Sequence, residues 1–192
     1  MRNVILFLHS SLDGFVEGPN GAMDIGWVAY NEELEKHAKE ILSTVDTVFW
    51  GKGTYEMMMN YWTSVPSNPD STEYEIEHAK WIEETSKVVF STTLEQANWK
   101  NSRLVKENIE EEIKNIKKQS GNDIIILGSP RFAHSLMELD LIDVIKITIS
   151  PVIIGSGLPL FKGLGTKRSL SLVENKTFNS GVIGLTYNIV KS

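Results

Sequence analysis

Short apolar segments alternate along this chain with segments whose apolar residues recur every three or four positions, which limits the folds open to it. The segment 123–127 (DIIIL) is almost wholly apolar, as expected of a central strand in a parallel sheet. Strands are also predicted over 4–10, 47–50, 87–91 and 144–149. Helical spacing predicts helices between them, over 32–44, 54–60, 73–85, 109–120 and 130–139.

The end of the chain shows a different pattern. Two strand-like segments, 169–178 and 182–190, flank Asn179-Ser180-Gly181, a sequence suited to a hairpin turn. Alternating strands and helices predict an α/β fold with a mostly parallel central sheet, helices on both faces and a C-terminal antiparallel hairpin. Such sheets bind ligands beyond the carboxyl ends of their strands, so the residues that follow each strand are the candidate site.

Composition narrows the function classes. The 192 residues, 41% of them hydrophobic, fit a single domain over 1–192. No cysteine is present and the four histidines lack ligand spacing, so no metal site is predicted. A net charge of −6 argues against nucleic-acid binding. No segment has the length and apolarity of a membrane span, and the first residues do not resemble a signal peptide, so the expected location is the cytoplasm.

The second predicted strand is followed by Gly51, Lys52, Gly53 and Thr54. The glycines let a phosphate approach the backbone, Thr54 can cap the next helix, and the helix N-terminus offers free amides. Lys52 would add a cation. The alternative is a tight strand-to-helix turn with a solvated lysine.

A similar segment follows the strand 123–127. Gly128 and Ser129 form a small-residue turn into a helix, where amides and the helix dipole suit a pyrophosphate, and Arg131 and Phe132 lie in the first helical turn. The alternative is an ordinary helix entry with an exposed arginine, because the full glycine-rich dinucleotide motif is absent.

Three further residues have weaker signals. Asp13 follows the first strand and would place a carboxylate near a reacting heterocycle, although Asp-Gly is also a favoured turn dipeptide and the structural role is preferred. Asp24 either pairs with a substrate or is solvated in a loop. His9 lies near the end of the first strand, where a hydrogen-bonded core histidine is the usual finding.

Taken in order, these segments resemble the dihydrofolate reductase superfamily, and within it bacterial proteins similar to the C-terminal reductase domain of riboflavin-biosynthesis deaminase-reductases. The similarity spans nearly the whole chain. The matching stretches are 11–16 (SLDGFV), 51–56 (GKGTYE), 126–129 (ILGS) and 139–161, which contains SPVIIGSGLPLF.

The resemblance implies a dihydrofolate reductase-like three-layer fold, NADPH as hydride donor and a homodimer. It places Lys52 at the adenosine 2′-phosphate, and Gly53, Thr54 and the pair Gly128-Ser129 at the pyrophosphate. Gly51 begins the same cofactor-binding motif, and Ser91-Thr92 lie beside the adenosine. Arg131 and Phe132 belong to the same implied cofactor site, and His9 with Ser10 would line the nicotinamide cleft. Asp13 and Asp24 are the candidate catalytic carboxylates.

Two residues depart from the family pattern. Lys52 stands where arginine is usual. Lysine keeps the positive charge but cannot form the paired hydrogen bonds that an arginine makes with a phosphate. Ser129 stands where a second glycine is usual, which predicts either a backbone that avoids positive φ or a looser approach to the cofactor.

The leading functional hypothesis is an NADPH-dependent reductase of a pyrimidine- or pterin-like small molecule, most similar to 5-amino-6-(5-phosphoribosylamino)uracil reductase. The alternatives are reduction of dihydrofolate itself and a non-catalytic nucleotide-binding protein that kept the fold.

Overall fold

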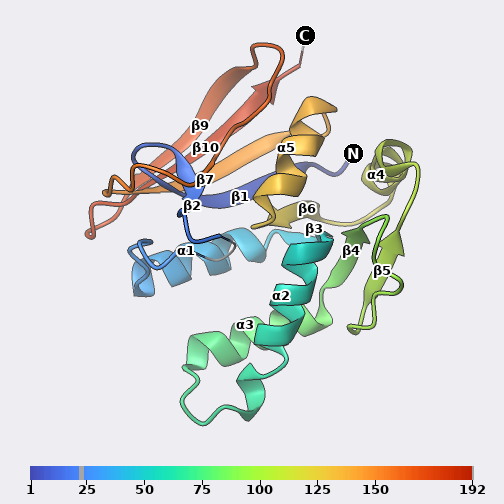
Figure 1. The fold of residues 1–192 in the computed structure, drawn as a ribbon, viewed down its shortest axis with the longest axis horizontal. Helices are drawn as coiled ribbons and strands as arrows, with labels where there is room; N and C mark the ends of the chain where they lie inside the picture. Colours follow the sequence, from blue (N-terminus) through green and yellow to red (C-terminus); the bar gives the residue numbers. More distant parts are fainter. Residues whose placement is uncertain (22–23, 192) are drawn as a thin grey trace.

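A central sheet of eight strands organises the protein (Figure 1). The computed structural model describes residues 1–21 and 24–191. The sheet strands are β1 (Val4–Ser11), β3 (Val45–Gly51), β4 (Ser86–Phe90), β5 (Ser102–Val105), β6 (Asp123–Leu127), β7 (Val144–Ser150), β9 (Ser169–Thr177) and β10 (Ile183–Val190). A separate antiparallel pair is formed by β2 (Phe15–Glu17) and β8 (Leu158–Pro159).

The strand order is β5-β4-β3-β6-β1-β7-β10-β9. The strands from β5 to β7 are parallel to their neighbours, whereas β10 runs antiparallel to both β7 and β9. The hairpin turn lies where the sequence predicts it, with Gly181 at φ +84°. The predicted fold class, a mostly parallel sheet with an antiparallel C-terminal hairpin, is therefore confirmed.

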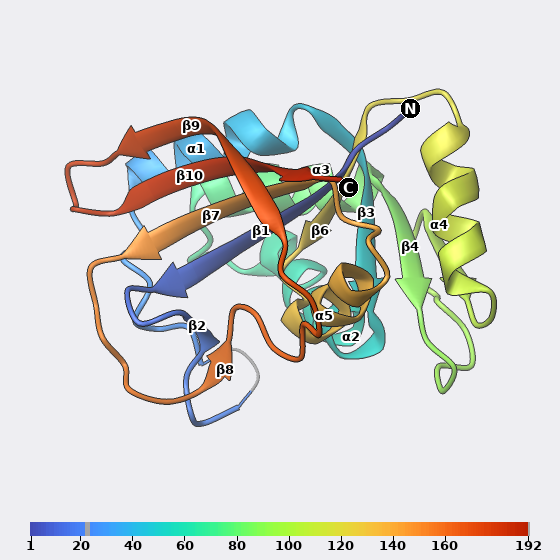
Figure 2. The ribbon, with the colours of Figure 1, turned by 90° about the horizontal axis from the view of Figure 1, so that it is seen from above.

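Helices cover both faces of this sheet (Figures 1 and 2). They are α1 (Glu32–Leu42), α2 (Lys52–Trp62), α3 (Glu73–Glu84), α4 (Ile109–Lys118) and α5 (Pro130–Glu138), with a short 3-10 helix at Val65–Ser67. Because side chains alternate along a strand, Leu6 and Leu8 of β1 pack in the cluster that includes α4 and α5, whereas Ile5 and Phe7 pack in the cluster of α1, α2 and α3.

The start of α2 differs from the prediction. The helix begins at Lys52, and Gly51 is its N-cap in an extended conformation, so Thr54 lies inside the first turn and does not cap the helix. The small strands β2, β5 and β8 were also missed, because two to four residues are too few to show a period. Helix α3 begins with a capping box, in which the side chains of Thr72 and Glu75 each bond the backbone N–H of the other.

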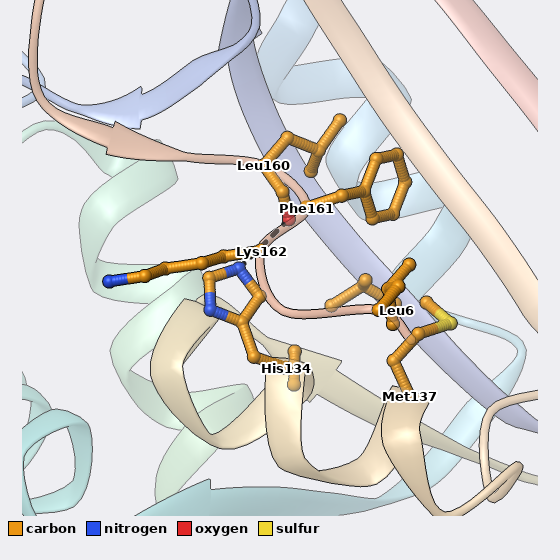
Figure 3. A pocket seen from close by; sticks show the side chains of 8 residues that line it. Leu6, His134, Met137, Leu160, Phe161 and Lys162 are labelled. Atoms are coloured by element: carbon orange, nitrogen blue, oxygen red, sulfur yellow. Dashed lines mark hydrogen bonds between the residues drawn. The ribbon is translucent and has the colours of Figure 1, made fainter. Parts of the chain in front are cut away.

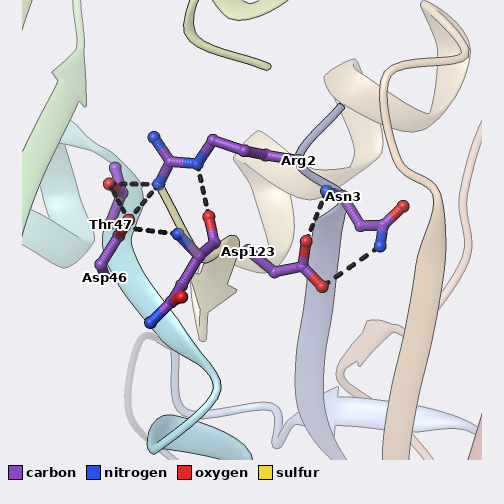
Figure 4. A network of polar contacts seen from close by, with 6 residues as sticks. Arg2, Asn3, Asp46, Thr47 and Asp123 are labelled. Atoms are coloured by element: carbon purple, nitrogen blue, oxygen red, sulfur yellow. Dashed lines mark hydrogen bonds and ion pairs between the residues drawn. The ribbon is translucent and has the colours of Figure 1, made fainter. Parts of the chain in front are cut away.

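A polar network fixes the amino ends of three parallel strands (Figure 4). Arg2, just before β1, bonds the carboxylate of Asp46 in β3, and its Nε donates to the carbonyl of Asn122 at 2.5 Å. The backbone N–H of Asn3 donates to Asp123 of β6 at 2.7 Å. Side-chain hydrogen bonds thus hold the amino ends of β1, β3 and β6 together. The carboxyl ends of these strands lie on the opposite side of the sheet.

Candidate functional site

The carboxyl ends of β4, β3, β6, β1 and β7 lie side by side, because these strands are parallel and adjacent (Figure 2). This order brings together the segments that the sequence singled out after each strand. They are 91–92 after β4, 51–54 after β3, 128–132 after β6 and 9–14 at the end of β1. The predicted site therefore lies along the carboxyl ends of the parallel strands.

The N-termini of α2 and α5 are joined at this edge. The backbone N–H of Gly51 donates to the Ser129 hydroxyl at 3.1 Å, and Ser129 is buried. A Cβ at Gly51 would lie 3.3 Å from Cβ of Phe132. The absence of a side chain at Gly51 therefore lets the two helix starts approach closely. The N–H groups of their first turns, which have no partner within their own helix, lie in one region.

Gly128 and Ser129 both adopt left-handed backbone conformations, with φ of +68° and +57°. Of the two alternatives for Ser129, avoidance of positive φ is wrong: serine keeps the conformation that glycine favours. Its hydroxyl also holds the neighbouring helix start. A Cβ added to Gly128 would lie 3.8 Å from the side chain of Met58 and 3.9 Å from that of Thr54, so the backbone of Gly128 is close to α2.

Two cations flank the helix starts. Lys52 is the first residue of α2 and is partly exposed, with Nζ 3.9 Å from Glu56. Arg131, in the first turn of α5, forms an ion pair with the buried carboxylate of Glu17 in β2 at 2.9 Å. Sequence reasoning missed Glu17, because the strand that carries it is too short to be recognised.

The remaining predicted cofactor residues lie on the β4 side. The ring of Phe132 stacks on Phe90 at a centroid distance of 4.9 Å, so Phe132 also packs against the core. The Ser91 hydroxyl accepts hydrogen bonds from the N–H groups of Thr93 and Leu94, at 3.1 and 3.0 Å. Ser91 therefore shapes the turn after β4, and Thr92 is exposed within it.

Asp13 anchors a distant loop. Its carboxylate accepts hydrogen bonds from the N–H groups of Ile154 and Gly155, at 3.2 and 2.8 Å. Hydrogen bonding from Ser11, and then from these amides, lowers the pKa of Asp13, which favours the ionised form. This is the structural role preferred for Asp13, and its catalytic role stays a prediction.

Asp24 is hydrogen-bonded to its neighbours in the sequence. Its carboxylate accepts hydrogen bonds from the backbone and side-chain amides of Asn20, at 3.1 and 2.9 Å. The indole of Trp27 donates to the Asp24 carbonyl at 2.9 Å. These contacts link Asp24 to Asn20 and Trp27, and its catalytic role stays a prediction.

His9 lies on the α1 side of β1. Its Nδ1 shares a hydrogen bond of 2.5 Å with the hydroxyl of Thr148 in β7. The ring makes edge contacts with Phe7 and Tyr30, at centroid distances of 5.4 and 5.5 Å. Burial, and then the charge of His37, lower the pKa of His9 to about 4, so the imidazole is neutral near pH 7.

The segment after β8 is fixed on α5 (Figure 3). Nε2 of His134 lies 3.1 Å from the Pro159 carbonyl and 3.0 Å from the Leu160 carbonyl, so this nitrogen carries the proton and donates. The apolar hollow beside it, lined by Leu6, Met137 and Leu160 among others, is filled by side chains and leaves no room for a ligand.

Over residues 1–21 and 24–191, no group of three or more histidine, aspartate or glutamate side chains is placed to hold a metal ion. None of the helices in the same ranges is long and apolar enough to span a membrane.

The strand order and the helices on both faces define an α/β domain with a dihydrofolate reductase-like fold. The model of the RibD C-terminal domain matches residues 2–183, and the chain belongs to that family. YyaP of Bacillus subtilis (strain 168), an uncharacterised protein, is 32% identical over 188 residues, which cover 97% of this chain and 95% of that one.

Solved structures show the same fold. A putative riboflavin biosynthesis protein from Shewanella sp. PV-4 superposes with a TM-score of 0.76 at 21% identity, covering 98% of this chain and 99% of that one. A deaminase and 5-amino-6-(5-phosphoribosylamino)uracil reductase from Thermotoga maritima gives 0.68 at 16% identity, covering 98% and 57%. Dihydrofolate reductase from Enterococcus faecalis, complexed with NADP(H), gives 0.61 at 13% identity, covering 98% and 97%.

Proposed function

We propose that this protein is an NADPH-dependent reductase of a pyrimidine- or pterin-like heterocycle, most similar to 5-amino-6-(5-phosphoribosylamino)uracil reductase. One observation carries the cofactor assignment: the starts of α2 and α5 are held together by the bond from Gly51 to Ser129, with Lys52 and Arg131 beside them.

This arrangement fits a dinucleotide pyrophosphate. Free N–H groups at a helix start and the positive end of the helix dipole both attract phosphate oxygens, and two such starts meet here. Left-handed Gly128 and Ser129 orient the backbone at the start of α5. Lys52 supplies the charge for the 2′-phosphate that distinguishes NADPH from NADH.

Bound NADPH would supply the hydride, and the protein's own part is to orient both ligands and exclude water. The Enterococcus faecalis neighbour, which is complexed with NADP(H), and the Thermotoga maritima neighbour, whose name includes a uracil reductase, support this choice of cofactor and substrate class. Asp13 and Asp24 remain the proposed carboxylates near the substrate.

Lys52→Ala should raise the Kd for NADPH about tenfold, roughly 1.4 kcal/mol, because a charge-assisted phosphate contact is lost. The Kd for NADH should change little. Nicotinamide fluorescence during titration measures both. Lys114→Ala, which removes an exposed lysine of α4, is the matched control. Failure of the unmodified protein to bind either cofactor would overturn the reductase assignment.

We further propose that a second copy of this chain covers the free side of β9 and β10. Eight of the nine residues of β9 are exposed and its outer edge is unpaired in the described sheet. Leu170 and Leu172, 41% and 52% exposed, lie opposite Ile189 and Tyr187 on one face. An apolar sheet face beside a free edge is suited to pairing with an identical edge.

Leu172→Lys should therefore convert a dimer to a monomer, with a dissociation constant raised about a hundredfold, because a buried lysine would lack a partner. Sedimentation velocity across a dilution series measures the change. Ser171→Lys adds the same charge on the opposite face of β9 and should leave the dimer intact. A monomeric unmodified protein would contradict the proposal.

A further inference from the structure

The α1-facing side of β1 and β7 changes from apolar to polar toward the candidate site. Along β1, Phe7 is followed on the same side by His9 and Ser11. In β7 the residues directly opposite are Thr148 and Ser150, both 0% exposed. The core thus ends, at the carboxyl ends of these two strands, in polar side chains: Ser11, Thr148 and Ser150 are buried, and His9 is partly buried.

Burying a hydroxyl group costs free energy unless the group has a hydrogen-bond partner, so the partners of these side chains indicate why polar residues stand here. Part of the reason is local: the Ser150 hydroxyl accepts a weak hydrogen bond of 3.4 Å from the backbone N–H of Ala29. This bond ties the segment before α1 to the sheet. The hydroxyl of Thr148 bonds the imidazole of His9.

The His9–Thr148 bond fixes one nitrogen of the ring and leaves the other available. Nε2 of His9 has no hydrogen-bond partner among the residues that the structure describes, while Nδ1 is bound to Thr148. The half-exposed ring of Tyr30 stands edge-on to the imidazole at 5.5 Å. A free ring nitrogen and an exposed aromatic ring therefore lie together, near the end of β1.

We propose that His9 and Tyr30 bind the heterocyclic ring of the substrate, with His9 Nε2 hydrogen-bonding a ring nitrogen or carbonyl, and that Thr148 positions His9. The inference rests on the proposed function for the reaction and names the substrate side of that site. It also replaces the sequence-based prediction that His9 contacts the cofactor. The ligand class is a planar heterocycle with polar ring atoms, such as a substituted uracil.

The chemistry of a neutral imidazole fits this role. Neutral imidazole has one donor and one acceptor nitrogen, and the bond that Nδ1 makes with Thr148 determines which of them Nε2 becomes. A group that stays neutral across ordinary pH values is suited to binding a neutral heterocycle. His9 is thus a substrate-binding residue, and Thr148 acts through it.

Binding can be tested without turnover by NMR of protein labelled with ¹⁵N in its four histidines. We expect 5,6-diaminouracil, added to the protein with and without NADPH, to shift the Nε2 and Nδ1 signals of His9. The signals of His78, against α2, and of His134, bound to the segment after β8, are internal controls and should stay. Saturable binding of the probe with no change at His9 would overturn the inference.

Variants separate the substrate side from the cofactor side. His9→Gln and Thr148→Val should weaken the probe about tenfold, because a buried polar group loses its partner, and should leave the Kd for NADPH within about twofold. Thr148→Ser retains the hydroxyl and should restore probe binding. A larger effect on NADPH than on the probe would assign His9 to the cofactor and overturn the inference, while keeping the reductase function.

The two proposals fail differently. If the unmodified protein binds no NADPH, the proposed function is lost, yet the response of His9 to the probe still decides whether this is a heterocycle site. If NADPH binds and the probe affinity of His9→Gln equals that of the unmodified protein, the function stands and the role of His9 is wrong.

Discussion

Replacing Ser129 with aspartate should raise the Kd for NADPH at least about a hundredfold while the protein stays folded, because like charges brought together in a binding site cost several kcal/mol. The new carboxylate would lie at the starts of α2 and α5, where the pyrophosphate is proposed to bind. Aspartate tolerates the left-handed backbone of Ser129 and can accept the hydrogen bond from Gly51. Its charge also suits helix N-termini, so stability should fall little or rise.

Nicotinamide fluorescence titration measures the Kd for NADPH, and urea unfolding of the same samples measures the free energy of unfolding. The control is Ser129→Gly, which removes the hydroxyl but fits the positive φ and adds no charge, so NADPH binding should stay within a few-fold of the unmodified protein. Unchanged NADPH affinity in a folded Ser129→Asp protein would place the pyrophosphate elsewhere.

Lys87→Met should lower the free energy of unfolding by about 2–3 kcal/mol, because the carbonyls of Ile82 and Thr85 would lose a buried side-chain donor. Lys87 begins the buried part of β4 and is 0% exposed. Its Nζ donates to the carbonyls of Ile82 and Thr85 at 2.6 and 2.8 Å, and it lies 4.7 Å from the ring centroid of Trp99. The lysine thus caps the C-terminus of α3 from inside the core.

Urea denaturation monitored by circular dichroism measures the free energy of unfolding of both proteins. Lys80→Met, which removes an exposed lysine from the same helix, should change the free energy of unfolding by less than about 0.5 kcal/mol. Equal effects of the two substitutions would show that the cap contributes nothing.

The same lysine predicts a pH dependence of stability. Burial lowers the pKa of Lys87 from its ordinary value of 10.5 to about 8. Between these values the unfolded chain binds the proton and the folded protein does not, so stability rises with pH across this window. The gain from Lys87 should be about 2 kcal/mol between about pH 7.5 and pH 10. Parallel pH profiles for the unmodified and Lys87→Met proteins would contradict it.

Much of the fold follows from local sequence. The segment 123–127 is strand β6 as predicted, and the alternation around it gives the parallel sheet with its terminal hairpin. Errors concentrate at helix ends. The helix predicted over 109–120 ends at Lys118, and its N-cap residue, Asn108, is left-handed and makes no capping bond with its side chain. Several residues can end or begin a helix almost equally well, so boundaries are weakly encoded.

For the candidate site, too, some features can be predicted from the sequence and others are seen only in the structure. Glycine and small residues after β3 and β6 indicate a phosphate site from the sequence alone, because their backbone freedom is a property of the residues themselves. The sequence does not indicate that the hydroxyl of Ser129 bonds Gly51, which lies 78 positions earlier in the chain. Nor does it show that Glu17 pairs with Arg131, 114 positions later, or that Asp13 holds Ile154 and Gly155.

Side-chain periodicity predicted the α/β class, and the resemblance of four motifs in order predicted the family. The segments proposed to hold a phosphate were also chosen from the sequence, since each depends on only a few neighbouring positions. Folding of the whole chain was needed to establish which strand ends are neighbours and which polar groups meet there, including His9 and Thr148, 139 positions apart. Such pairs are set by strand order and register, which depend on packing of the whole sheet and leave little trace in any short stretch of sequence.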